Sequence, residues 1–406
     1  MRIAYLSTLY PPNVAGGAEL VLRSQAEAMS ARGHDVQVIA LRAEPGVHRE
    51  VVNGVLVTTV GIHNEYFNFW QVSHPAHKRL LWHVRDRNNR TMAEALRELL
   101  RESQPDIVCC HNLAGWSISA WEAIDSLGIP IVQVLHDQYL RCSKSNMFRN
   151  GKNCDKPCLD CRALRMSHAQ ASEQVTAVVG VSRFVLDRLL NAGYFSEAPI
   201  REVLYNFGTS VPSELPPKQS APRLRLGFIG FLAESKGIEW LLRTFKESRL
   251  SDVELLIAGR GEEQYEKGLR ERYGDADDIK FLGFIKPADF FAQVDVAIVP
   301  SLWNDTLPSV VFESLGYGVP VVGSRRGGIP EMVLDGVNGL VFEPDDPASL
   351  VSAIVKLRDD PALLSSLRSA CRPSSAKFYD VQGWAAGQEE IFRRARQHVD
   401  SRAVPA

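Results

Sequence analysis

The chain has 406 residues, of which 45% are hydrophobic and 23% charged, with a formal net charge of −2 at pH 7. Such a length exceeds one ordinary core, so two domains are expected, and the near-neutral charge disfavours nucleic acid as a partner. The N-terminal M-R-I-A-Y-L-S segment lacks a charged-then-apolar leader, and no apolar run approaches the roughly 20 residues that span a bilayer. We therefore expect a cytoplasmic protein.

Short apolar segments alternate with amphipathic ones along the first half of the chain. Strands are expected at 3–7, 36–41, 107–110, 131–135, 178–181 and 203–204, with a helix over 18–32 that Gly33 closes. Near-continuous apolar strands between helices predict a parallel sheet covered on both faces. Residues 51–60 carry Asn53-Gly54 and predict either a small hairpin or a strand with a bulge.

A Pro- and Ser-rich segment at 209–222 interrupts this pattern and predicts a linker. A second series follows it, with strands at 224–229, 254–258, 280–282, 294–299 and 319–322. The fold class is therefore α/β, with two Rossmann-like doubly wound domains facing across a cleft, and ligands are expected at the carboxyl ends of the strands. The predicted boundaries are 1–208 and 223–377 for the domains, and 378–406 for a C-terminal helix.

Residues 300–323 hold two carboxylates, Asp305 and Glu313, separated by seven residues. The first follows an apolar strand and the second lies within the next predicted helix. Asp305 or Thr306 is expected to cap that helix, with Pro308 in its first turn. A helix N-terminus attracts a phosphate, and carboxylates on either side of it can hold sugar hydroxyls. The alternative is a helix cap and one surface acid.

Further candidate residues follow other predicted strands. Gly16 and Gly17 allow a ligand close to the backbone at a helix N-terminus, although the loop lacks the dinucleotide pattern G-x-G-x-x-G. His111 ends one strand, and His136 with Asp137 ends the next. A local hydrogen bond that fixes the loop is an equal alternative for His136 and Asp137.

Four cysteines within twenty residues form an insertion at 142–161. This cluster, with its C-x3-C-x2-C ending, is typical of a tetrahedral structural zinc site, and an iron–sulfur cluster or four free thiols are the alternatives. The expected ligands are Cys142, Cys154, Cys158 and Cys161. Cys109, Cys110 and Cys371 are predicted as small core residues.

Aromatic and basic residues alternate between Tyr66 and Arg90. This composition predicts either contact with an anionic membrane surface or a lipid-linked phosphate, or a core helix with a solvated basic face. Both interpretations stay open.

The chain as a whole resembles the retaining glycosyltransferases of the GT-B fold, family four, also called group 1. The resemblance extends from Arg2 to about Gln397. It is carried in order by segments 11–19 (P-P-N-V-A-G-G-A-E), 105–112, 179–183 (V-G-V-S-R), 230–237 (G-F-L-A-E-S-K-G), 258–262, 281–287, 305–313 and 326–331 (R-G-G-I-P-E). The cysteine insertion, Asp305 in place of Glu and Phe231 in place of Arg depart from the family pattern. The missing Arg leaves Arg183, Arg325 and Arg326 as candidate replacements.

The resemblance implies a role for each matching residue. A nucleotide sugar would donate its sugar with retention at the anomeric carbon, without a catalytic cofactor or metal, and the last helix would cross back to the first domain. Catalytic roles fall to His111, Asp305, Glu313 and Lys236. Donor-binding roles fall to Gly16, Gly17, Gly230, Lys236, Gly259, Arg260, Phe284, Pro308, Ser309, Val310 and Glu313. Acceptor-side roles fall to His136, Asp137 and Arg183.

The expected function is transfer of a sugar from a UDP- or GDP-sugar to a hydroxyl of a glycan or lipid-linked intermediate of surface-polysaccharide synthesis. The enzyme would be cytoplasmic, or peripheral on the inner face of the membrane, with no nucleic-acid partner. A sugar-nucleotide epimerase on the same fold and a non-catalytic, decayed scaffold are the alternatives, and Phe231 is the only support for the second.

Overall fold

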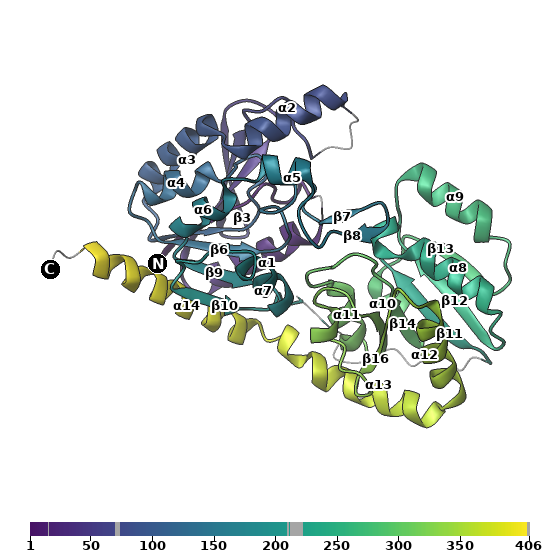
Figure 1. Ribbon diagram of the computed structural model, residues 1–406. Helices are drawn as coiled ribbons and strands as arrows, with labels where there is room; N and C mark the ends of the chain where they lie inside the picture. Colours follow the sequence, from purple (N-terminus) through teal and green to yellow (C-terminus); the bar gives the residue numbers. More distant parts are fainter. Residues whose placement is uncertain (15, 70–73, 209–210, 212–221, 404–406) are drawn as a thin grey trace. The chain divides into compact units, whose positions relative to one another are not determined.

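The computed structural model describes residues 1–14, 16–69, 74–208, 211 and 222–403 (Figure 1). The predicted linker at 209–222 therefore lies outside the described residues, except for its positions 211 and 222. The chain divides into two compact units. The first comprises Met1–Met147, Asp155–Phe207 and Val381–Ala406, and the second comprises Phe148–Cys154 and Gly208–Asp380.

The first unit is built on a sheet with the strand order β10-β9-β6-β5-β1-β2-β4-β3. All neighbours pair in parallel except β3 and β4, which form an antiparallel hairpin across Asn53 and Gly54, both with positive φ. The hairpin alternative for residues 51–60 is therefore confirmed. The strands are β1 (Arg2–Leu6), β2 (Asp35–Arg42), β3 (Val47–Val52), β4 (Val55–Gly61), β5 (Ile107–Cys110), β6 (Ile131–Leu135), β9 (Ala177–Gly180) and β10 (Ile200–Val203).

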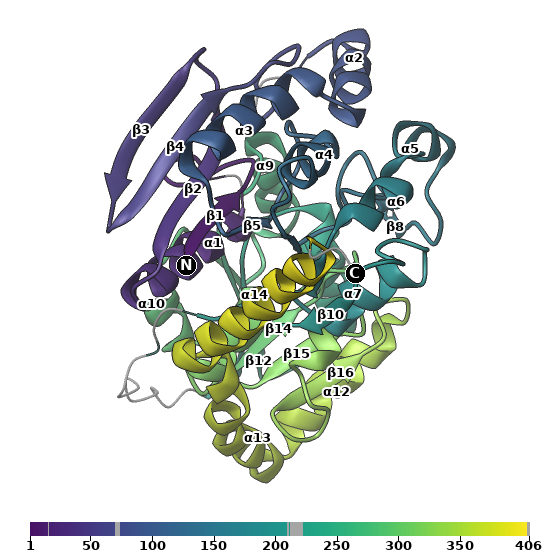
Figure 2. The same ribbon diagram turned by 90° about the vertical axis from the view of Figure 1, so that its left-hand side faces the viewer.

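Helices cover this sheet on both faces. The strands after β1 are added on one side of it up to β3, and the strands from β5 onward are added on the other side. Right-handed crossovers in these two opposite directions place the connecting helices on opposite faces. The long helix α14 packs against α1, β6 and β10, so the C-terminal segment belongs to the first unit (Figure 2). The helices are α1 (Gly17–Ala31), α2 (Ala76–Arg87), α3 (Arg90–Ser103), α4 (Ser119–Asp125), α5 (Leu159–Leu164), α6 (His168–Ala171), α7 (Arg183–Leu190) and α14 (Val381–Ala403).

The second unit is built on a wholly parallel sheet with the order β13-β12-β11-β14-β15-β16, accompanied by the small hairpin β7 (Phe148–Arg149) and β8 (Lys152–Asn153). Its strands are β11 (Leu224–Ile229), β12 (Val253–Ala258), β13 (Ile279–Gly283), β14 (Val296–Val299), β15 (Val321–Ser324) and β16 (Gly339–Phe342). Its helices are α8 (Ile238–Ser248), α9 (Glu263–Tyr273), α10 (Pro287–Phe291), α11 (Ser309–Gly316), α12 (Pro347–Asp359) and α13 (Pro361–Ser375), with a 3-10 turn η2 (Glu234–Lys236).

The two sheets confirm the predicted fold class, an α/β protein with two Rossmann-like domains. The apolar runs that predicted strands are buried on both faces, as β5, β6, β9 and β14 show along their whole length. This burial explains why these strands are apolar throughout and do not alternate with polar residues. Among the described residues, no helix is both long and apolar enough to cross a membrane.

The core of the second unit is closed around Gly227 in the central strand β11. A Cβ atom at this position would lie 2.4 Å from Cγ1 of Val294 and 2.6 Å from Cζ of Phe290, both of which are buried. These side chains therefore fill the space that a larger residue would need. Gly268 on α9 offers a contrast, since its nearest neighbour would be a side-chain nitrogen of Arg272 at 3.8 Å.

We predict that Gly227→Ala lowers the free energy of unfolding of the second unit by about 1–3 kcal/mol, because the added methyl group overpacks the core. Gly268→Ala is the control and should raise it by up to about 1 kcal/mol, since alanine favours a helix. Urea unfolding followed by circular dichroism measures both. Equal midpoints for Gly227→Ala and the wild type would contradict the packing described here.

Candidate active site

The order of strands in the second sheet reverses between β11 and β14, which are neighbours although β12 and β13 separate them in the chain. The loops that follow these two strands meet at the carboxyl edge of the sheet. The backbone N–H groups of Leu302 and Trp303 donate to the carbonyl of Ser235, at 3.0 and 3.2 Å. Such a reversal is where doubly wound sheets bind their ligands.

Lys236 and Asp305 form an ion pair at this position. Nζ of Lys236 lies 2.5 Å from Oδ2 of Asp305, and it stands 5.1 Å from the ring centre of Trp303. The lysine side chain is 33% exposed and the aspartate side chain 7%. The Lys236 ammonium group is therefore accessible to solvent, whereas the Asp305 carboxylate that it contacts is buried.

Helix α11 begins at Ser309 with Pro308 as its N-cap residue, so the expected N-cap position at Asp305 or Thr306 lies too early in the chain. Pro308 has no side-chain acceptor to offer to the first N–H groups of the helix. The Asp305 carboxylate lies further back in the loop, where it pairs with Lys236.

Glu313 lies one turn into α11, next to this helix start. It forms a side-chain hydrogen bond with Ser309, and burial raises the pKa of its carboxyl group. Ser309 is exposed and Val310 half-buried. The predicted donor residues Pro308, Ser309, Val310 and Glu313 thus occupy one helical end, near a lysine that the sequence places about 70 residues earlier.

Two glycines bring the neighbouring loops together. The N–H of Gly230 donates to the carbonyl of Ala258, and a Cβ on Gly259 would lie 1.8 Å from the carbonyl oxygen of Gly230. Gly259 also has φ +126°, so a side chain there would be strained. Arg260 follows, with its guanidinium 5.9 Å from the exposed ring of Phe284. All these predicted donor residues lie on loops after β11, β12 and β13.

The position where the family carries Arg is occupied by Phe231, which is exposed. Of the three proposed substitutes, Arg325 pairs with Glu343 at 2.5 Å and Arg326 with Asp345 at 2.6 Å. The third, Arg183, is the first residue of α7 in the other unit. Lys236 reaches the loop before α11 through its ion pair with Asp305.

In the first unit, His111 follows β5 and His136 follows the adjacent strand β6. Nδ1 of His111 and Nε2 of His136 are 2.8 Å apart, and the two rings stack with centroids 4.9 Å apart. Burial lowers the pKa of His136 to about 4, and burial and His136 together lower that of His111 further. Both imidazoles are therefore neutral at pH 7. They line a small pocket together with Asn112, Leu113, Gln133, Val134, Leu135, Asp137, Tyr139 and Leu140.

Asp137 and Glu19 place two acidic groups near this pocket. Burial raises the pKa of Asp137 to about 6, and the charge of Glu19 contributes to the rise. Glu19 is buried in the first turn of α1, where its Oε2 accepts the N–H of Gly16 at 2.9 Å. Gly17 begins α1, with open space where a Cβ would lie. No role was expected for Glu19, although its place three residues after the N-cap Gly16 is that of the acidic residue of a capping box.

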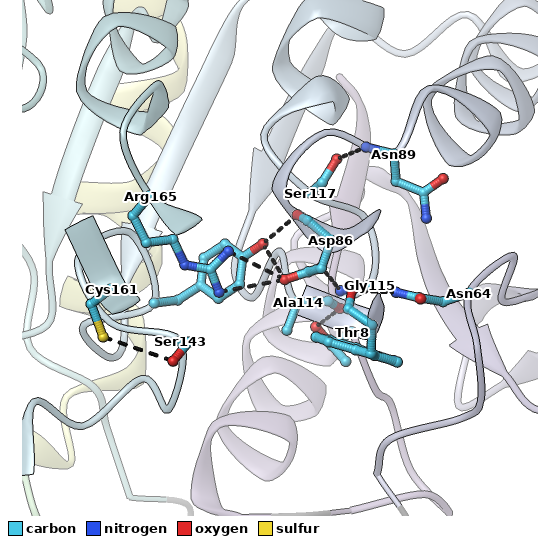
Figure 3. Close-up of polar contacts among 12 residues, drawn as sticks. Thr8, Asn64, Asp86, Asn89, Ala114, Gly115, Ser117, Ser143, Cys161 and Arg165 are labelled. Carbon is cyan, nitrogen blue, oxygen red and sulfur yellow. Dashed lines mark hydrogen bonds and ion pairs between the residues drawn. The ribbon is translucent and has the colours of Figure 1, made fainter. Parts of the chain in front are cut away.

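A second feature that the sequence did not reveal is a buried ion pair between Asp86 of α2 and Arg165, which follows α5 (Figure 3). The Asp86 carboxylate accepts the Gly115 N–H at 2.6 Å and the Tyr139 hydroxyl at 2.9 Å, and Arg165 approaches it at 3.4 Å. Burial raises the pKa of Asp86 to about 6, although the positive charge of Arg165 acts to lower it. This cluster ties α2 and the cysteine insertion to the loop after β5.

The structure does not support the expected four-cysteine zinc site. Within the described residues, no three or more His, Cys, Asp and Glu side chains are arranged to hold a metal ion. Cys154 belongs to the second unit, whereas Cys142, Cys158 and Cys161 belong to the first. In the first unit the Sγ atoms of Cys142 and Cys161 are 3.9 Å apart, and Cys161 also forms a side-chain hydrogen bond with Cys158. Cys109, Cys110 and Cys371 are fully buried, as expected.

Comparison with known proteins adds to this geometry. Residues 15–207 match the family described as Glycosyltransferase Family 4, and residues 223–360 match the one described as Glycosyl transferases group 1. The chain is similar to an uncharacterised 42.6 kDa protein in the cps region of Klebsiella pneumoniae. The two are 26% identical over 332 residues, which cover 82% of this chain and 87% of the relative.

Solved structures agree on the fold. Sucrose-phosphate synthase from Thermosynechococcus elongatus superposes with a TM-score of 0.75 at 19% identity, covering 97% of this chain and 98% of that one. HepE of Anabaena, in complex with UDP-glucose, superposes with a TM-score of 0.67 at 19% identity and covers 97% and 99%.

Two Rossmann-like sheets, each with a reversal of strand order, and the likeness to these solved structures define a protein of the GT-B fold. The chain belongs to the family four, group 1 glycosyltransferases, and it is a retaining glycosyltransferase that takes a sugar from a nucleotide sugar. The resemblance that the sequence showed is thereby confirmed.

We predict that the neutral His111–His136 pair makes stability depend on pH. The folded state holds His136 with a pKa of about 4, below the usual 6.5, so unfolding takes up protons between these values. This contribution is complete above pH 6.5 and is lost as the pH falls toward 4, amounting to at most about 3 kcal/mol.

Urea unfolding at several pH values would show a steeper loss of stability below pH 6.5 in the wild type than in His136→Gln. His77→Gln, on the exposed surface of α2, is the control and should follow the wild-type curve. Parallel curves for the wild type and His136→Gln would contradict a buried neutral pair.

Proposed function

We propose that the enzyme transfers a sugar from a UDP- or GDP-sugar to a hydroxyl of a glycan or lipid-linked intermediate of surface-polysaccharide synthesis. We also propose that it acts in the cytoplasm, at the inner face of the membrane. The observation that carries the donor assignment is the Lys236–Asp305 pair in the loops at the carboxyl edge of the second sheet, just before α11.

The second unit is suited to a nucleoside diphosphate. The N–H groups at the start of α11 and the positive end of its dipole favour a diphosphate, and Lys236 adds a full charge. An ammonium group has three donors, so Lys236 can keep its bond to Asp305 and still donate to a phosphate oxygen. Glu313 is proposed to accept the ribose hydroxyls, Asp305 to hold the donor sugar, and Arg260 and Phe284 to contact the base.

This arrangement supplies the chemistry that the reaction needs. When the glycosidic bond to the diphosphate breaks, negative charge accumulates on the leaving phosphate. Fixed N–H dipoles and a lysine placed beforehand at that point stabilise the charge without reorganisation. The family resemblance implies attack on the same face as departure, with the leaving phosphate oxygen taking the proton of the acceptor hydroxyl.

The first unit is proposed to serve the sugar and acceptor side. His111 and His136 are neutral at pH 7, so each ring offers one donor and one acceptor and suits a sugar hydroxyl better than a phosphate. We propose that His111 holds the transferred sugar, and that His136, Asp137 and Arg183 contact the acceptor. The backbone at Gly16 and Gly17 is proposed to approach the donor.

We predict that Lys236→Met weakens binding of the matching nucleoside diphosphate about ten- to hundredfold, because a charge-assisted hydrogen bond is lost. Calorimetric titration with UDP, GDP and ADP measures the effect and identifies the base. Lys246→Met is the control, because Lys246 donates to the carbonyl of Arg272 at the opposite end of the sheet. This variant should bind the nucleotide as the wild type does.

An unchanged affinity in well-folded Lys236→Met would refute the assignment of the diphosphate site. If the wild type bound none of the three nucleotides, Phe231 would be decisive, and the protein would be a scaffold that has lost donor binding.

A further inference from the structure

Helix α2 exposes an apolar stripe to solvent. Leu80, Leu81 and Val84 are 57%, 49% and 54% exposed, although they lie within one helix of 12 residues. Counted at 100° per residue, these three side chains lie on the arc of the helix opposite Trp82 and Asp86. Single exposed leucines are ordinary, whereas a stripe of three on one helical face indicates a contact surface.

The opposite face of α2 is anchored, so the stripe cannot turn inward. Trp82 is buried, and its indole N–H donates to the carbonyl of Tyr66 at 3.0 Å. Asp86 is fully buried and is bound by Gly115, Tyr139 and Arg165 (Figure 3). Because these contacts fix the rotation of the helix, Leu80, Leu81 and Val84 stay directed to solvent.

Basic side chains border the apolar stripe on both sides. Lys78 and Arg85 lie at one edge of the arc and Arg87 lies at the other, whereas Arg79 lies toward Asp86. Arg85 also pairs with Glu65, at 3.2 Å. The single acidic residue of α2, Asp86, is buried against Arg165. The helix surface is thus cationic, although the chain as a whole carries a formal charge of −2.

The neighbouring helix α5 resembles α2 in its exposed side chains. It contacts α2, and Leu159 at its start and Met166 in the turn after it are both strongly exposed. Arg162, three residues after Leu159 in the helix, is exposed as well. Exposed apolar and basic side chains therefore also occur in this neighbouring segment.

We propose that this surface, formed by Leu80, Leu81 and Val84 with Lys78, Arg85 and Arg87 at its edges, docks on an anionic lipid bilayer. An apolar stripe with cations at both edges is the pattern of a helix that lies in the membrane interface, where leucines enter the acyl boundary and cations meet the headgroups. Nucleic acid would match the cations but would leave the leucines in water. The complementary charge and the exposed leucines together favour lipid.

This inference rests on the proposed function in one respect, because a lipid-linked acceptor would lie in the same membrane. The vesicle experiment itself requires no turnover, and nucleotide titration of the same samples separates the two claims. If vesicle binding is absent while nucleotide binding is normal, the docking surface is refuted and the proposed donor site is not.

The test is flotation of the full chain with vesicles of phosphatidylglycerol and phosphatidylcholine in equal parts, and with vesicles of phosphatidylcholine alone. We expect binding to the anionic vesicles only, weakening as salt rises. Leu80→Ser/Leu81→Ser/Val84→Ser should bind at least about tenfold more weakly. Lys78→Gln/Arg87→Gln, which leaves the leucines in place, should lose about fivefold for each charge removed.

Leu334→Ser/Val337→Ser is the matched control, because it removes two exposed apolar side chains from the second unit. It should bind vesicles as the wild type does. Failure of the wild type to float with anionic vesicles, equal binding to both kinds of vesicle, or normal binding by both α2 variants would overturn the proposal.

Discussion

The reversal of strand order in each sheet is the constraint on which the candidate site depends. In the second sheet, β12 and β13 extend to one side of β11, and β14, β15 and β16 to the other. The loops after β11 and β14 therefore meet at the carboxyl edge of the sheet before the chain continues to helices on opposite faces, and such an edge is where doubly wound sheets bind ligands. Lys236 and Asp305 occupy that position, and the first sheet places His111 at the corresponding reversal between β1 and β5.

The Lys236–Asp305 pair matters for the proposed site for a second reason. An aspartate that capped α11 would satisfy N–H groups that a phosphate needs, and its charge would repel the phosphate. The Asp305 carboxylate is instead bound to Lys236, which is partly exposed. The ion pair is therefore compatible with the proposed binding of a diphosphate at the start of α11.

Much of the fold and some of the site could be predicted from the sequence. Parallel strands are apolar throughout when both faces are buried, so β5, β6 and β14 were visible as such, and residues directly after them, such as His111, were predicted at a ligand edge. Contacts between distant segments could not be predicted, because neither partner has a local signal. The pairing of Asp86 with Arg165, 79 positions apart, and that of Lys236 with Asp305, 69 apart, are of this kind.

The cysteine insertion is a case in which a local sequence signal predicted more than the structure supports. The spacing of the four cysteines predicted one metal site, yet Cys154, directly after the hairpin strand β8, belongs to the second unit. The exposed side of α2 was ambiguous for a related reason. Its composition fitted both a core helix and a surface helix, and only the burial of Trp82 and Asp86 reveals which side faces solvent.

The most direct test of the central claim is a crystal structure with the nucleoside diphosphate that binds. The account predicts that the phosphates lie at the N-terminus of α11, within hydrogen-bonding distance of the backbone N–H groups after Pro308 and of Nζ of Lys236. The ribose should lie beside Glu313. A nucleotide bound elsewhere in the protein, with the start of α11 and Lys236 uncontacted, would contradict the account.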